Sequence, residues 1–165
     1  MTDRPLTQNL RPDGSPVWLA DYEANGGYEG LRRVLTDSTP EACQQVVKDA
    51  RLRGRGGAGF PTGMKWSFVP MGEKAGSGPK YLIANADEME PGTFKDRIIL
   101  EQDPHQLIEG MILAAYAIQA DVAYIFLRGE YTVAAQRVAA AIKECYAAGY
   151  LGQDIRGSGY SLELH

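Results

Sequence analysis

The pattern of apolar and polar positions predicts a first helix that begins after residue 38. Its start is marked by Ser38-Thr39-Pro40-Glu41, because a hydroxyl can cap free amides, proline suits the first helical position and an acid favours the positive helix end. We expect this helix to run to about Leu52 and to end where Gly54 begins a glycine-rich stretch. Its apolar face is predicted to consist of Ala42, Val46, Val47 and Ala50.

The same pattern predicts two strands, Lys80–Asn85 and Val122–Leu127. Both are short and mostly apolar, so we expect them to be buried on both faces. Asp103-Pro104 starts a helix between them, and Thr132 can cap a further helix that Gly149 stops. The apolar stripes are Leu107, Ile108, Met111, Ile112 and Ala115 in the first helix, and Ala134, Val138, Ile142 and Cys145 in the second.

The order of these elements indicates the α/β class with a largely parallel sheet, because helices and strands alternate. Connections in such sheets are right-handed, and ligands gather at the carboxyl ends of the strands. Ser161–His165 alternates like a third strand. A finished domain rarely ends within a strand, so we expect the sequence to be part of a longer chain.

Residues 1–37 differ from the rest because they are rich in Pro, Gly, Asp and Asn. We expect an irregular arm that wraps on something larger, with a short helix from Gly27 to Leu35. The sequence is therefore divided into an N-terminal arm, 1–37, and a domain segment, 38–165.

Composition excludes some classes of protein. The net charge of −4 argues against a nucleic-acid binder, which needs a basic surface to displace counterions. The longest apolar stretch, Met111–Ile118, is too short to span a membrane. The N-terminus lacks the apolar segment of a signal peptide, so we expect a cytoplasmic protein.

The two cysteines and two histidines do not indicate a disulfide, a metal cluster or a catalytic group. Cys43 and Cys145 lie far apart in helical patterns, and two buried or half-buried thiols are a better interpretation than a disulfide. An iron–sulfur cluster generally takes four cysteines, so this sequence cannot hold one alone. His105 and His165 are interpreted as structural.

A glycine-rich loop, residues 53–63, is the first candidate site. Five glycines fall within ten positions, where amides can approach an anion closely, and Arg53 and Arg55 add positive charge. A flexible connector is the alternative. Three of the glycines match the letters of the dinucleotide fingerprint, but a helix precedes the loop where that fingerprint needs a strand. The ordinary dinucleotide motif is therefore excluded.

Lys65, Trp66 and Phe68 follow the loop directly. A lysine can pair with a phosphate or sit near a flavin edge, and aromatic rings can stack on adenine. For either aromatic residue taken alone, core packing is the favoured interpretation.

An acidic turn, Asn85–Gly92, follows the first predicted strand and is the second candidate site. Its amide and carboxylates can accept hydrogen bonds from ribityl or ribose hydroxyls and from flavin N–H groups. A solvated loop or a magnesium site are alternatives. Lys95, Asp96 and Arg97 nearby suggest local ion pairing, so a metal site is the least favoured.

Four strings together resemble one family in order and spacing: G-R-G-G-A-G-F-P-T-G-x-K-W-S-F, N-A-D-E-x-E-P-G-T-F-K-D-R, P-H-x-L-I-E-G-M and Y-I-F-L-R-G-E-Y. It is the NADH-binding flavoprotein subunit shared by respiratory complex I, some NAD-dependent formate dehydrogenases and NAD-linked hydrogenases. The resemblance covers roughly residues 41–165. Pro5-Leu6 and the segment from Pro16 to Gly30 are more similar to the bacterial complex I subunit than to its hydrogenase relatives.

This resemblance implies a Rossmann-like FMN-binding domain in which NADH stacks on the flavin. The residues implied to contact FMN are Gly54, Arg55, Gly56, Gly57, Lys65, Asn85, Asp87 and Glu88. Phe60 and Phe68 would flank the adenine, and Glu90 would face NADH. The remaining loop residues of the expected cofactor-binding set are Ala58, Gly59, Pro61, Thr62 and Gly63. No side chain is assigned as a catalytic acid, base or nucleophile, and no metal ligand is assigned.

The implied activity is hydride transfer from NADH to FMN, followed by electron transfer through iron–sulfur clusters to quinone. The implied partners are the other peripheral-arm subunits of complex I, a 2Fe–2S thioredoxin-like subunit and the large iron–sulfur subunit, at the cytoplasmic face of the inner membrane. Family members continue into a second flavin-site segment, a ubiquitin-like domain and a helical domain that holds a 4Fe–4S cluster. This sequence lacks those parts, so we expect an incomplete domain with little activity alone. A diaphorase subunit of a formate dehydrogenase or hydrogenase, or an inactive assembly module, are the alternatives.

Overall fold

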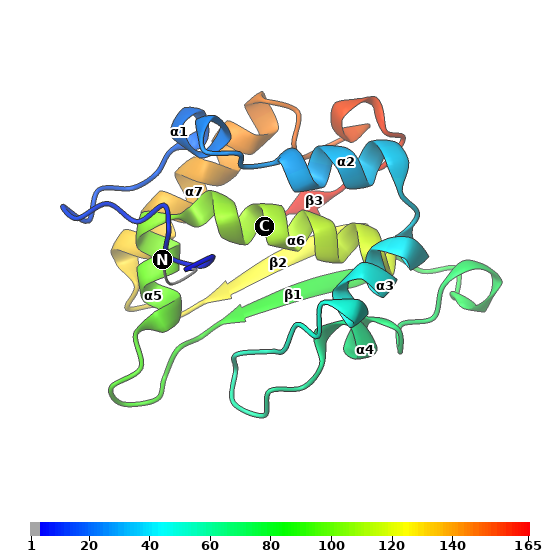
Figure 1. Ribbon diagram of the computed structural model, residues 1–165, viewed down its shortest axis with the longest axis horizontal. Coiled ribbons are helices and arrows are strands. Elements are labelled where there is room, and N and C mark those ends of the chain that lie inside the picture. Colours follow the sequence, from blue (N-terminus) through cyan, green and yellow to red (C-terminus); the bar gives the residue numbers. More distant parts are fainter. Residues whose placement is uncertain (1–3) are drawn as a thin grey trace.

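The computed structural model describes residues 4–165, which build a three-stranded sheet in the order β1-β2-β3 (Figure 1). The strands are β1 Tyr81–Ala86, β2 Val122–Leu127 and β3 Glu163–Leu164. Both pairings are parallel, and the register sets Tyr81 opposite Val122 and Ala86 opposite Leu127. The α/β class and the parallel sheet predicted from the sequence are confirmed.

The described residues also contain seven α-helices. Helix α6 lies across β1 and β2, and α7 connects β2 to β3 (Figure 1). The bounds are α1 Leu19–Ala24, α2 Glu29–Asp37, α3 Pro40–Asp49, α4 Thr62–Trp66, α5 Lys95–Gln102, α6 Pro104–Ile118 and α7 Thr132–Ala147, with short 3-10 turns at Gly72–Lys74 and Ile155–Gly157. Helices α1, α4 and α5 were not expected from the sequence.

Helix α3 begins as predicted, because the Thr39 hydroxyl accepts the Ala42 amide at 3.2 Å and Pro40 takes the first position. Its predicted apolar face is wrong. The buried residues are Cys43 and Gln44, while Val46 is 67% exposed. The reason is the contact with α6, to which the Gln44 side chain is tied by a 2.6 Å bond to a backbone carbonyl.

Helices α6 and α7 carry the core on the stripes predicted for them. Buried positions of α6 include Ile108, Met111 and Ile112, and Gly149 follows α7 at a φ of 73°. Thr132 does not cap α7, however. It is already the first helical residue, and Tyr131 occupies the capping position without a side-chain bond.

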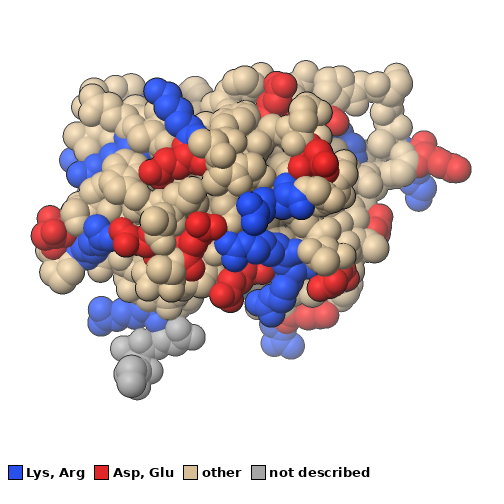
Figure 2. Space-filling view, turned by 90° about the horizontal axis from the view of Figure 1, so that it is seen from above, with Lys and Arg blue, Asp and Glu red and all other residues tan. Residues whose placement is uncertain are grey.

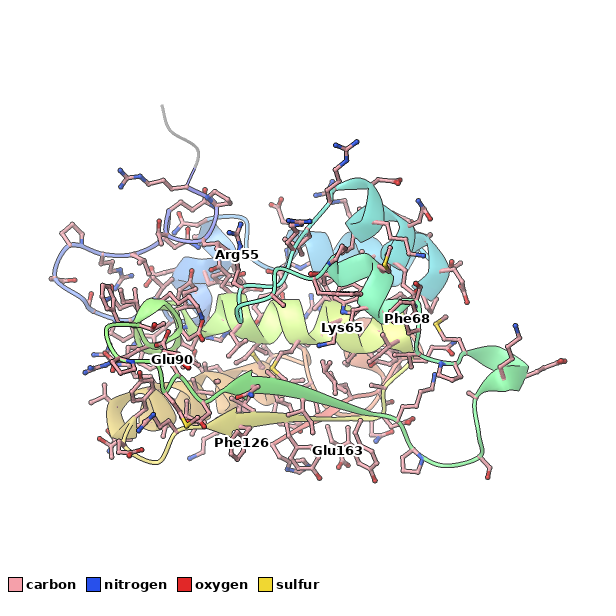
Figure 3. All side chains as sticks on the ribbon, turned by 90° about the horizontal axis from the view of Figure 1, so that it is seen from below. Arg55, Lys65, Phe68, Glu90, Phe126 and Glu163 are labelled. Atoms are coloured by element: carbon pink, nitrogen blue, oxygen red, sulfur yellow. The ribbon has the colours of Figure 1, made fainter. Side chains whose placement is uncertain are left out.

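The expectation that both strands are buried on both faces is wrong. One face packs on the helices, while the other exposes Tyr81, Ile83, Tyr124 and Phe126 by 42 to 64%. In Figure 3, Phe126 and Glu163 point away from α6 on this open side. No helix among residues 4–165 covers it, and a strand is buried on both faces only between two layers.

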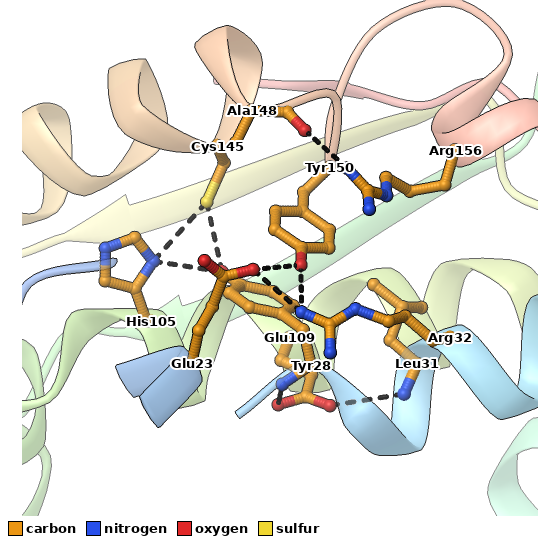
Figure 4. A network of polar contacts seen from close by, with 10 residues as sticks. All are labelled: Glu23, Tyr28, Leu31, Arg32, His105, Glu109, Cys145, Ala148, Tyr150 and Arg156. Atoms are coloured by element: carbon orange, nitrogen blue, oxygen red, sulfur yellow. Dashed lines mark hydrogen bonds and ion pairs between the residues drawn. The ribbon is translucent and has the colours of Figure 1, made fainter. Parts of the chain in front are cut away.

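The segment expected to be an irregular arm contains two helices and joins the core. Val17, Tyr22, Tyr28 and Leu31 are buried in one cluster with residues of α6 and α7. The helix expected from Gly27 to Leu35 is present as α2, displaced by two residues. Figure 4 shows the polar contacts that join this segment to α6 and α7.

Both cysteines are free and buried, as expected from the sequence. Across residues 4–165 there is no helix long and apolar enough to cross a membrane, nor a group of three or more His, Cys, Asp or Glu side chains that could hold a metal ion. The face seen in Figure 2 carries acidic and basic side chains side by side.

Candidate functional site

The glycine-rich loop projects between α3 and α4 and is closed by backbone hydrogen bonds. The Gly54 amide donates to the Phe60 carbonyl at 2.9 Å, and the Thr62 amide donates to the Leu52 carbonyl at 2.8 Å. Gly57 has a φ of 128°, a value at which a side chain would strain the backbone. The sequence therefore shapes a closed loop whose backbone at Gly57 requires glycine.

Two hollows lie between this loop and β1. The smaller, of about 250 Å³, is lined by Arg55, Gly56, Asn85, Lys95 and Asp96 together with apolar residues of β1, α5 and α6. The larger hollow, of about 550 Å³, is lined mainly by the loop, by α4 and by β1. Its lining residues include Gly54, Gly56, Ala58, Gly59, Phe60, Thr62, Lys65, Trp66, Leu82 and Ile83. Gly56 lines both, so the hollows adjoin at the loop.

Open space beside the loop glycines distinguishes them from Gly63. A Cβ added at Gly56 or Gly57 would meet no atom within 4 Å. A Cβ at Gly63 would lie 2.7 Å from the backbone nitrogen of Lys48, so this glycine lets α4 pack on α3. The structure thus gives Gly63 a packing role, while the open loop leaves room for a ligand.

Phe60 and Phe68 form an aromatic pair at the rim. Their ring centroids are 6.2 Å apart at an interplanar angle of 55°, and the side chains are 45% and 68% exposed. The core-packing interpretation is wrong for Phe68, although Trp66 does pack partly against the core. Figure 3 shows Lys65 on α4 and Phe68 just beyond the end of that helix.

The acidic turn divides into residues with different surroundings. Asn85 lines the smaller hollow, and its side-chain oxygen accepts a hydrogen bond from the Asp87 amide at 3.0 Å. Glu90 is exposed at the tip, as Figure 3 also shows. Glu88 instead points into the protein and is buried.

Glu88 caps the start of α5. Its two carboxylate oxygens accept the amides of Asp96 and Arg97, each at 3.1 Å, and one of them lies 3.8 Å from the Lys95 ammonium. Burial alone would raise the pKa of Glu88, but these donors and the positive charge hold that pKa below its ordinary value. The expected local ion pairing is confirmed by Lys95–Asp96 at 2.7 Å and Arg97–Glu101 at 2.9 Å.

The hollows bring together much of the predicted set: Gly54, Arg55, Gly56, Ala58, Gly59, Phe60, Thr62, Lys65 and Asn85. Outside their walls lie Gly57, Pro61, Gly63, Phe68, Asp87, Glu88 and Glu90. Sequence reasoning missed the lining residue Lys95, whose only signal was its position just after the acidic turn. The cationic side chains and loop amides suit a ligand with an anionic group.

Residues 47–165 match the family model described as the Nuo51 FMN-binding domain. The chain belongs to this family. It is 58% identical to an NADH-quinone oxidoreductase subunit of Rhizobium meliloti over 93% of its length, and 53% identical to the corresponding NADH-quinone oxidoreductase subunit of Escherichia coli over 97%. The resemblance inferred from the four strings is confirmed.

This FMN-binding-domain chain spans about a third of those relatives, 35% and 36% of their lengths. Among solved structures, it is similar to a chain of an NAD+-reducing NiFe-hydrogenase in the H2-reduced state. The TM-score is 0.69 and the identity 39%, over 92% of this chain and 25% of the other. The similarity in sequence and in fold extends over nearly all of the chain.

Proposed function

We propose that the protein to which this chain belongs is the NADH dehydrogenase module of respiratory complex I. The observation that supports this most directly is the pair of adjoining hollows between a glycine-rich loop and the end of β1, in a chain of the FMN-binding family. This chain would supply one wall of the flavin site. We expect the 165 residues alone to retain little FMN, because half a site must still offset the entropy of immobilising the ligand.

The residues of the two hollows fit an FMN. The space beside Gly56 and Gly57 would fill if either carried a side chain, so a flat or anionic group can approach the backbone there. Arg55 flanks the smaller hollow and would balance a phosphate, and Asn85 would bind ribityl hydroxyls, while the charge of Lys95 is matched by its ion pair with Asp96. Lys65 would lie near the electron-rich edge of the ring.

The aromatic pair is proposed to bind the adenine of NADH. Phe60 and Phe68 expose their rings to water beside the larger hollow, where they could flank an adenine. Stacking of a base on an aromatic side chain contributes about 1–3 kcal/mol. Glu90, exposed at the tip of the acidic turn, would face NADH.

Hydride transfer requires orientation of the two ligands more than acid–base catalysis. The residues around the two hollows would hold the FMN, which would supply the hydride-accepting and one-electron chemistry. The side chains of this chain would bind, orient and exclude water, and none is assigned as an acid, base or nucleophile. The proposed route onward passes through iron–sulfur clusters of the longer protein and of the 2Fe–2S and large iron–sulfur subunits, at the cytoplasmic face of the membrane, to quinone.

A diaphorase subunit of a hydrogenase or formate dehydrogenase is the second candidate, because the hydrogenase chain shares the fold at 39% identity. Identity to the NADH-quinone oxidoreductase relatives is higher, at 53% for the Escherichia coli protein over 97% of this chain. We therefore favour complex I.

The test is to purify the full-length protein, identify its released flavin by chromatography and assay it with its partner subunits. We expect FMN and NADH-dependent reduction of quinone. FAD, or electron exchange with hydrogen or formate in place of quinone, would contradict the proposal.

A further inference from the structure

We infer that the turn after β2, Arg128–Tyr131, is a positioning element for the NADH side of the site and acts through Glu88. The inference rests on the proposed function. Ala86 and Leu127 are paired in register at the ends of β1 and β2, so the turns that follow the two strands begin side by side. The acidic turn therefore starts next to Arg128.

Glu88, Arg97 and Tyr131 form a closed triangle. The Arg97 amide donates to Glu88 Oε2 at 3.1 Å, and the Tyr131 hydroxyl donates to the same oxygen at 3.3 Å. The third side is a cation–π contact, with the Arg97 guanidinium carbon 5.6 Å from the centre of the Tyr131 ring. Each residue is thus held by the other two, and they come from three different segments.

Arg128 adds a contact to the backbone of the same turn. Its guanidinium donates to the Glu88 carbonyl at 3.4 Å and is itself oriented by Glu130, 3.2 Å away. The turn after β2 therefore reaches both the side chain and the backbone of Glu88. Neither Arg128 nor Tyr131 lines the two hollows, so they position the site without forming its walls.

The two halves of the acidic turn depend on Glu88 differently. Asn85 belongs to β1 and is fixed by the sheet, opposite Phe126. Beyond Glu88, Met89 is 66% exposed, and Glu90 is tied by a backbone bond from Thr93 at 3.0 Å. Loosening Glu88 should therefore displace Glu90, which is proposed to face NADH, and leave the flavin side at Asn85 in place.

The test is Tyr131→Phe in the full-length protein, which keeps the ring against Arg97 and removes only the hydroxyl. Tyr116→Phe is the matched control, because Tyr116 is also half-buried and its hydroxyl donates to the Ser38 carbonyl at 2.7 Å, far from the turn. For Tyr131→Phe we expect KM for NADH to rise about fivefold, the effect of one lost hydrogen bond, with kcat and FMN content unchanged. In a protein that already carries Glu90→Gln, the Tyr131→Phe substitution should raise KM for NADH little further.

Amide hydrogen exchange separates this inference from the proposed function, because it needs no activity. We expect faster exchange at residues 89–97 in Tyr131→Phe and unchanged exchange in Tyr116→Phe. Unchanged exchange and KM, or a rise in KM that persists in full in the Glu90→Gln background, would overturn the inference. A wild-type protein without FMN or NADH oxidation would contradict only the proposed function.

Discussion

The Glu109 carboxylate accepts a hydrogen bond from the backbone amide of Tyr28 at 2.9 Å, which joins α6 to the start of α2. The same carboxylate accepts the Leu31 amide at 3.2 Å and the Tyr22 hydroxyl at 2.7 Å. One side chain on α6 therefore satisfies three donors of the N-terminal segment, including amides at a helix start that lack partners within the helix.

Removing this carboxylate should destabilise the protein. Glu109→Ala leaves three donors unsatisfied, and we expect it to lower the free energy of unfolding by about 2–4 kcal/mol. Denaturant titration measures the loss, and limited proteolysis should cut within residues 17–37 first. Glu73→Ala, at an exposed position, is the control. Equal stability of the two variants would show that Glu109 does not hold the segment.

The buried thiol of Cys145 predicts a loss of stability at alkaline pH. Burial raises the pKa of Cys145 from its ordinary 9.0 to about 12. The folded state holds this proton more tightly, so the contribution to stability is complete below pH 9 and is lost as the pH rises towards 12. Cys145→Ala should flatten part of the fall in unfolding free energy over that range. An unchanged slope, or rapid alkylation of native Cys145 at about pH 8, would contradict the assigned environment.

Gly57→Val should abolish flavin retention. A branched side chain at a φ of 128° strains the loop and occupies the space where the ligand is proposed to approach. Flavin absorbance per protein measures the effect. Gly76→Val, in an exposed loop where an added Cβ also meets no atom within 4 Å, is the control and should retain flavin. Wild-type flavin content in Gly57→Val would show that the loop only connects α3 to α4 and does not bind the flavin.

Truncation of Phe68 should weaken NADH binding. We expect Phe68→Ala to raise KM for NADH about 5- to 150-fold, because stacking on a base is worth about 1–3 kcal/mol, and to leave FMN content normal. Phe68→Trp should restore most of the affinity. Met64→Ala, on the adjoining short helix but outside the hollows, controls for damage to α4. Equal KM values for NADH in Phe68→Ala and Met64→Ala would show that the Phe68 ring does not contact NADH.

Long periodic helices could be predicted from the sequence, whereas three short helices could not. Helices α6 and α7 repeat their apolar positions over several turns, but α1, α4 and α5 are 6, 5 and 8 residues long, so a periodic pattern hardly develops. The open face of the sheet was also missed. An apolar strand has the same pattern whether one or two layers cover it, so Ile83 and Phe126 gave no sign of their exposure.

Site residues could be predicted from the sequence where residue type alone indicates the backbone conformation. They could not be predicted where the packing of helices and strands determines which way a side chain points. The glycines of the loop and the strand that contains Asn85 have local signals in the sequence. The inward turn of Glu88 depends on where α5 begins relative to β1, and the lining role of Lys95 depends on the same packing. Neither can be deduced from residue type and spacing.

An anaerobic titration of the full-length protein with NADH, followed by flavin absorbance, shows most directly whether this chain helps to hold an FMN that NADH reduces. If the glycine-rich loop and the end of β1 hold an FMN that NADH reduces, the flavin should bleach as NADH is added, with one NADH supplying the two electrons of each flavin and further NADH reducing the 4Fe–4S cluster expected in the full-length protein. A protein that cannot be loaded with FMN, or a bound flavin that dithionite reduces and NADH leaves oxidised, would contradict it.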